Sequence, residues 1–137
     1  MSRHRVLFLC THNSARSQMA EGLLRHLAGD RFAAFSAGTE ATAVRPEAVE
    51  VMREIGADIS AQRSETLKSY LDEPFDLVVT VCDAANDACP TFPGARERLH
   101  WSLPDPSPVA GEERLQAFRN VRDELRRRIT ERFVERR

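Results

Sequence analysis

Two kinds of segment are missing from this 137-residue chain: a run of about 18 apolar residues and a charged-then-apolar leader. The first absence argues against a membrane-spanning helix, and the second argues against secretion. The net charge of −1 excludes the strongly basic surface typical of nucleic-acid binders. Without repeats or low-complexity segments, residues 1–137 are long enough for one domain that needs no disulfides. We therefore expect a single-domain, cytoplasmic monomer.

Cysteine is scarce, with only Cys10, Cys82 and Cys89 in the chain. An odd number of cysteines is typical of reduced, reactive thiols rather than of a secreted disulfide framework. None of them shows the close Cys-x2-Cys or His-x3-His spacing of zinc sites. The sequence accordingly predicts neither a metal nor another cofactor.

Hydrophobic periodicity predicts alternating strands and helices. Strand patterns occupy residues 5–9, 32–36, 76–81 and 98–103. Helical patterns occupy residues 17–28, 46–55, 64–71 and 112–134, where Pro46 suits a first helical position, Gly56 a helix stop and Ser64 a cap. This alternation is typical of an α/β fold with a parallel sheet, right-handed crossovers and helices on both faces.

The first predicted strand leads into Cys10 and then a loop that ends in Arg16 and Ser17. In such a loop, inward-facing backbone N–H groups, a guanidinium and the start of a helix together cradle a tetrahedral oxyanion. We predict that the anion is bound by the loop from Cys10 to Ser17, which also contains Thr11, His12, Asn13, Ser14 and Ala15.

The same surroundings act on the Cys10 thiol. A free cysteine titrates near ~8.5, and at a helix N-terminus beside a cation this value can fall to roughly 3.5–7.5. Ser17 can also donate a hydrogen bond to the sulfur. We expect Cys10 to be a thiolate nucleophile. The alternative is a buried, unreactive cysteine at a strand end, with Arg16 on the surface of a helix.

Asp105 lies between Pro104 and Pro106, which restrict the backbone on both sides. A carboxylic acid held above a bound oxyanion can protonate a leaving oxygen, and we assign this role to Asp105. The alternative is an ordinary Asp-Pro turn. Cys10, Cys82 and Asp105 each follow a predicted strand, and ligands of parallel sheets bind beyond the carboxyl ends of the strands. All three should meet at one edge.

These residues resemble those of a known family. The sequence is similar to the low-molecular-weight tyrosine phosphatases at residues 10–17, 18–22, 36–38 and 105–106. Cys82-Asp83 and Cys89-Pro90 are more narrowly similar to the thioredoxin-coupled arsenate reductases built on that fold. The resemblance implies a four-stranded parallel sheet, arsenate as substrate and thioredoxin as reductant.

The resemblance also implies a three-cysteine relay. Cys10 attacks arsenate while Asp105 protonates the leaving hydroxide, and Cys82 then attacks the Cys10 sulfur so that arsenite leaves. Cys89 next attacks Cys82, and thioredoxin reduces the resulting disulfide. Residues 83–88 are predicted to be a short helix that unwinds when Cys82 and Cys89 are oxidised.

Two departures from the family stand out. Many relatives have glycine, suited to positive φ, where this chain has His12. Some relatives bind potassium near the loop through residues that match Asn13, Glu21 and Ser36 of this chain. Those relatives have threonine and aspartate where this chain has Arg63 and Glu65. An arginine there could replace the cation, so we expect no metal.

Two alternative functions differ in which residues they need. A tyrosine phosphatase needs only Cys10, Arg16 and Asp105, so Cys82 and Cys89 argue against it. A non-catalytic redox or oxyanion sensor needs no acid to protonate a leaving group, so Asp105 argues against a sensor.

Overall fold

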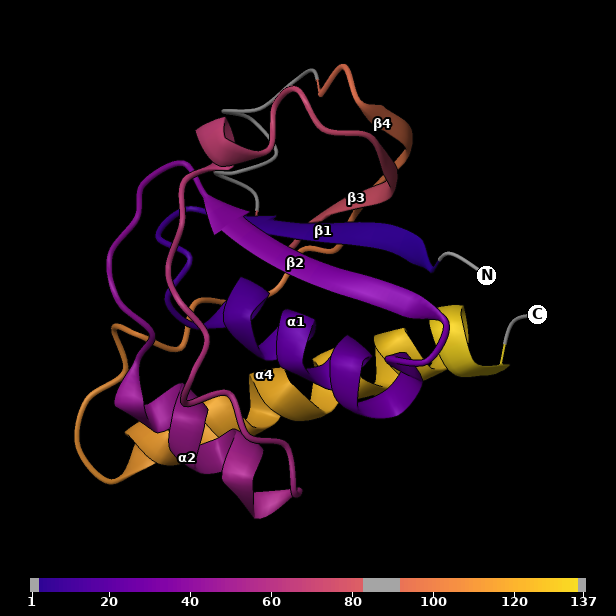
Figure 1. Ribbon diagram of the computed structural model, residues 1–137. Helices are drawn as coiled ribbons and strands as arrows, with labels where there is room; N and C mark the ends of the chain where they lie inside the picture. The colour runs from indigo at the N-terminus through magenta and orange to yellow at the C-terminus, as the bar shows by residue number, and fades with distance from the viewer. Residues whose placement is uncertain (1–2, 83–91, 136–137) are drawn as a thin grey trace.

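The computed structural model describes residues 3–82 and 92–135. Its centre is a four-stranded parallel sheet in the order β2-β1-β3-β4 (Figure 1). The strands are β1 (His4–Cys10), β2 (Phe32–Gly38), β3 (Phe75–Thr80) and β4 (Ala95–His100). Cys10 pairs with Gly38 and Leu9 with Thr80, so the carboxyl ends of the strands coincide at one edge of the sheet.

Three α-helices cover one face of the sheet (Figure 1). They are α1 (Arg16–Ala28), α2 (Pro46–Glu54) and α4 (Glu113–Ile129), which continues as a π-helical segment (Thr130–Glu135). Alternate strand residues face these helices because successive side chains of a strand point to opposite faces. This core includes Val6, Phe8, Leu77, Val79, Leu23, Met52, Phe118 and Leu125.

The opposite face of the sheet has its own apolar layer. Its buried members are Leu7, Leu9, Ala37, Phe75, Val78 and Phe92. The segment around the 3-10 helix Leu67–Ser69 packs on this layer through Leu67, Tyr70 and Leu71. Since both faces are covered, β1 and β3 are apolar along most of their length.

The structure confirms the predicted α/β fold with a four-stranded parallel sheet. Pro46 is the first residue of α2, and Gly56 follows that helix with a φ of +82°. The predicted helix at residues 112–134 corresponds to α4 and its π-helical extension. Among the described helices, none is long and apolar enough to cross a membrane.

The predicted helix at residues 64–71 is wrong. Only Leu67–Ser69 is helical, as a single 3-10 turn. The Ser64 hydroxyl does not cap a helix because it accepts a hydrogen bond from Thr42 N and donates to His12 O. The next residue, Glu65, gives its N–H to a side chain and its carbonyl to Gly38 N. Tertiary hydrogen bonds thus replace helical ones here.

The fourth strand begins and ends three residues earlier than the predicted range of 98–103. β4 spans Ala95–His100, and the apolar alternation of Leu99, Trp101 and Leu103 continues beyond its end. Trp101 N still donates to Thr80 O at 2.8 Å, so the chain remains attached to β3 as it approaches Leu103.

Candidate active site

The loop at residues 10–17 connects the end of β1 to the start of α1. Its carbonyl oxygens are held from outside: Thr11 O accepts from Glu40 N and Ser14 O from Arg45 N, both at 2.9 Å, and His12 O accepts from Thr42 Oγ1 at 3.0 Å. The C=O and N–H of a trans peptide point in opposite directions. The N–H groups that follow these carbonyls are therefore directed away from the outer segment, as an anion cradle requires.

The first turn of α1 adds to this cradle. The N-cap residue is Ala15, whose methyl group cannot accept a hydrogen bond from the helix N–H groups. Uncapped N–H groups and the positive end of the helix dipole favour a bound anion. The predicted helix start at residue 17 agrees to within one residue with the structure, in which α1 begins at Arg16.

Asn13, not His12, has the left-handed backbone of this loop. Its φ is +49°, a conformation that asparagine adopts more readily than most residues. His12 is exposed and its Nδ1 lies 3.3 Å from Glu40 Oε2. His12, which stands where many relatives have glycine, is thus not the residue with positive φ. The buried Asn13 side chain stabilises this turn through its own hydrogen bonds.

Cys10 is a free, buried thiol at the end of β1. Its Sγ lies 2.8 Å from Ser17 Oγ, the contact that the sequence predicted. Ser17 is itself fully buried, so water does not compete for this hydrogen bond. A hydroxyl at this distance can stabilise a thiolate.

Arg16 connects the loop to the segment that carries Asp105. The guanidinium donates to Leu103 O at 3.0 Å, and its Nη2 lies 3.7 Å from Asp105 Oδ2. The Arg16 side chain is largely buried, whereas Asp105 is partly exposed. Asp105 thus lies beside the arginine of the loop, with part of its side chain exposed to solvent.

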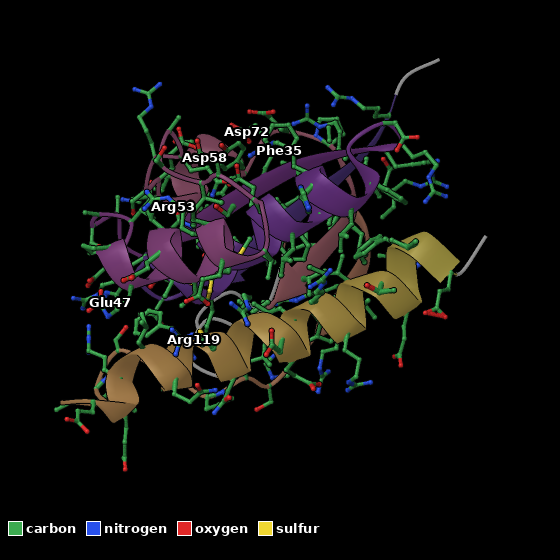
Figure 2. The ribbon with its side chains drawn as sticks, turned by 90° about the horizontal axis from the view of Figure 1, so that it is seen from below. Phe35, Glu47, Arg53, Asp58, Asp72 and Arg119 are labelled. Atoms are coloured by element: carbon green, nitrogen blue, oxygen red, sulfur yellow. The ribbon has the colours of Figure 1, made fainter. Side chains whose placement is uncertain are left out.

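The Asp105 loop is held by residues that the sequence did not reveal. Asp105 Oδ1 accepts from Ser107 N at 3.0 Å. Arg114, in the first turns of α4, donates to the carbonyls of Ser107 and Val109 and to Glu47 Oε2. The Arg114 hydrogen bond lowers the pKa of Glu47, which is labelled on α2 in Figure 2. Arg114 therefore ties the loop to two helices.

Cys82 is the second free, buried thiol at this edge. Its Sγ lies 3.4 Å from Thr11 Oγ1, in the loop itself. The preceding residue, Val81, donates its N–H to Leu9 O at 2.8 Å. The structure thus brings Cys82 to the same loop as Cys10. Cys89 and the predicted helix at residues 83–88 lie outside the described residues.

The positively charged side chain beside Glu21 is that of Arg25, not that of Arg63. Arg25 Nη2 lies 2.6 Å from Glu21 Oε2, and Ser36 Oγ donates to Glu21 Oε1 at 2.6 Å. The Arg63 side chain is exposed, whereas Arg25 is one helical turn from Glu21. No group of three His, Cys, Asp or Glu side chains suited to a metal occurs within residues 3–82 and 92–135.

The family follows from comparison with known proteins. A model of low molecular weight phosphotyrosine protein phosphatases matches residues 5–136. The chain belongs to this family. It is 49% identical over 131 residues to an arsenate reductase of Halalkalibacterium halodurans, covering 94% of both chains.

Solved structures agree with this result. An arsenate reductase in the phosphate binding state superposes with a TM-score of 0.82 at 33% identity, over 93% of this chain and 95% of that one. The thioredoxin-dependent arsenate reductase of Corynebacterium glutamicum gives 0.74 at 34% identity, over 94% of this chain and 59% of that one. The predicted family and fold are confirmed.

Proposed function

We propose that this protein reduces arsenate to arsenite, with Cys10 as nucleophile and Cys82 as the second thiol. The observation that carries the proposal is the contact between Cys82 Sγ and Thr11 Oγ1, which puts a second buried thiol beside the anion loop. A phosphatase has no use for such a thiol. The similarity to arsenate reductases supports the same conclusion.

The first step is a displacement at arsenic. Arsenate occupies the cradle, where the loop N–H groups and the Arg16 guanidinium neutralise its charge. The Cys10 thiolate forms a bond to arsenic as one As–O bond breaks, and Asp105 gives its proton to the departing oxygen, which leaves as water. The product is arsenic(V) bound to Cys10.

The second step transfers two electrons. The Cys82 thiolate attacks Cys10 Sγ, and the electron pair of the S–As bond moves to arsenic. Arsenic is reduced from (V) to (III), the two sulfurs are oxidised to the Cys10–Cys82 disulfide, and arsenite leaves. The Thr11 hydroxyl is close enough to Cys82 to stabilise its thiolate for this attack.

Cys89 completes the relay in our proposal. Its thiolate attacks Cys82, which frees Cys10, and thioredoxin then reduces the Cys82–Cys89 disulfide. The thioredoxin-dependent relative supports this choice of reductant. The cytoplasm, where thioredoxin keeps thiols reduced, is the compartment that suits such chemistry.

The experiment mixes the purified protein with arsenate, thioredoxin, thioredoxin reductase and NADPH, and follows NADPH oxidation and arsenite formation. We expect arsenate-dependent oxidation of NADPH, with one arsenite formed per NADPH because both are two-electron steps. Cys10→Ser and Cys82→Ser should each abolish arsenite formation, while Gln116→Ala, on the exposed side of α4, should not. Arsenate-independent NADPH oxidation, or none, would contradict the proposal.

The second candidate is a phosphatase, favoured by the family and by the shared Cys10, Arg16 and Asp105. We expect only a slow phosphatase side activity, which needs no second thiol. A well-folded Cys82→Ser protein should therefore still hydrolyse p-nitrophenyl phosphate, whereas Cys10→Ser should not. If the wild type hydrolyses this ester rapidly and forms no arsenite, the phosphatase is the correct function.

A further inference from the structure

A continuous series of side-chain hydrogen bonds leads from the surface of α1 to the Cys10 sulfur. It passes through three buried side chains, Gln18, Asn13 and Ser17. At the outer end, Arg25 Nη1 donates to Gln62 Oε1 at 2.9 Å, and Gln62 Nε2 donates to Gln18 Oε1 at 2.7 Å. Gln18 Nε2 then donates to Asn13 Oδ1 at 2.9 Å, and Asn13 Nδ2 donates to Ser17 Oγ at 2.8 Å. The fifth and last link joins Ser17 Oγ and Cys10 Sγ at 2.8 Å.

The orientation of the Asn13 amide is fixed by a backbone group. An amide side chain can be turned over without changing its shape, so its orientation must follow from its partners. Glu65 N can only donate, and it lies 2.8 Å from Asn13 Oδ1. That atom is therefore the oxygen, and the Asn13 NH2 group must face Ser17.

The two glutamines are fixed in the same way. Gln18 Nε2 lies 3.0 Å from the carbonyl of Arg63, which can only accept, so the Gln18 oxygen must face Gln62. Gln62 Nε2 also donates to Gln18 O at 3.0 Å. The Arg25 guanidinium can only donate, and it occupies the Gln62 oxygen. Every amide in the series thus donates toward Cys10.

The last link follows from the others. Ser17 Oγ already accepts from Asn13 Nδ2, so its own proton is free to point at Cys10 Sγ. A serine proton in this position favours the thiolate over the thiol, because a thiol would present a competing proton. Since Asn13, Ser17 and Gln18 are buried, neighbouring bonds polarise one another with little screening by water.

We infer that Gln18 and Gln62 are positioning residues that hold Cys10 as a thiolate, with the Arg25–Glu21 ion pair at the outer end of the series. This inference rests on the proposed role of Cys10 as the nucleophile. Gln62 contacts neither substrate nor sulfur; it acts through the amides that orient Ser17. The charged or titratable side chains of the anion loop and their direct partners are Arg16 with Asp105 and His12 with Glu40, and Cys82 contacts Thr11 of the same loop. All of them remain unchanged in the test.

The test measures how fast iodoacetamide modifies Cys10 as a function of pH, followed by the mass of the peptide that contains Cys10. Below the midpoint of the profile this rate is proportional to the thiolate fraction. Gln62→Ala should move the midpoint to higher pH and slow the reaction at low pH on the order of two- to fivefold. Gln116→Ala, which removes an exposed glutamine that bonds to Asn120 and Arg119 of its own helix, should reproduce the wild-type profile.

Two further variants separate the possible outcomes. Gln62→Glu keeps an acceptor for Arg25 but loses the donor to Gln18, so it should shift the midpoint in the same direction as Gln62→Ala. In a Ser17→Ala background, Gln62→Ala should cause no additional shift, because the last link is already absent. An equal shift with and without Ser17, or coincident profiles for Gln62→Ala and wild type, would overturn the inference.

The alkylation assay contains no arsenate or thioredoxin. A chain that failed to reduce arsenate could still show the predicted shift, and an active reductase could fail to show it. Failure of the proposed function and failure of this inference are therefore distinguishable.

Discussion

Gly38 is the position where one added methyl group should damage the active site most directly. Gly38 ends β2 opposite Cys10 of β1. A Cβ atom here would lie 2.7 Å from Thr11 O, 2.7 Å from Glu40 O and 2.8 Å from Asn13 N. All three are backbone atoms, so no side chain can rotate to make room. Thr11 and Asn13 belong to the anion loop, which must itself move.

The size of the effect follows from these distances. Real Cβ atoms stay beyond 3.0 Å, so Gly38→Ala must displace the loop by at least about 0.3 Å. Overpacking of this kind costs roughly 1–3 kcal/mol, which lowers Tm by about 3–15 °C in a chain of this size. Because a misplacement near 1 Å costs about 10²-fold in rate, we expect kcat/KM for p-nitrophenyl phosphate to fall by roughly 10- to 100-fold.

The matched control is Gly56→Ala. Gly56 has a φ of +82° and no atom within 4 Å of its added Cβ, so the variant should lose about 1 kcal/mol through backbone strain alone. Gly56→Ala should therefore lower Tm while leaving kcat/KM unchanged. If Gly38→Ala kept the wild-type kcat/KM, or if Gly56→Ala lost as much activity, the argument from the loop would be refuted.

The remaining predictions concern the acid, the second thiol and stability. Asp105→Asn should slow the single-turnover chemical step about 10²–10⁴-fold while arsenate affinity, measured by titration calorimetry, is kept; an unchanged rate would remove Asp105 as the acid. Thr11→Val removes the hydroxyl 3.4 Å from Cys82 Sγ and should slow arsenite release but not ester hydrolysis, so equal losses in both assays would contradict this role. The hydrogen bond from Arg114 lowers the pKa of Glu47 below its usual value of 4.5. The ionised Glu47 therefore contributes fully to the free energy of unfolding above about pH 4.5, and this contribution is lost as the pH falls through the folded-state pKa. Urea unfolding should accordingly show a difference between wild type and Glu47→Gln at neutral pH that shrinks below about pH 4, and a constant difference would argue against the ion pair.

Local features of the site could be predicted from the sequence. The loop from Cys10 to Ser17 is continuous, so its spacing alone located Cys10, Arg16 and the start of α1. Asp105 could be placed at the same edge because parallel strands end together. The structure brings Arg16 to 3.7 Å from Asp105, in agreement with that expectation.

Features that depend on distant segments could not be predicted. Ser64 is a good helix cap by residue type, yet Thr42 and His12 use its hydroxyl. Gln62 lies 44 residues from Gln18 in the sequence, and no periodic pattern connects them. Arg114 likewise carries no local signal for its contact with Glu47, which lies 67 residues away in the sequence. Long-range hydrogen bonds of this kind leave no trace in composition or spacing.

The central claim, that electrons reach arsenic from Cys10 and Cys82, is tested most directly by a burst experiment with Cys89→Ser. The reduced variant is mixed with arsenate, the arsenite formed per chain is counted, and the disulfide is mapped by mass spectrometry. The account predicts about one arsenite per chain and then a stop, with Cys10 bonded to Cys82. Sustained turnover with thioredoxin, or arsenite release without a Cys10–Cys82 disulfide, would contradict it.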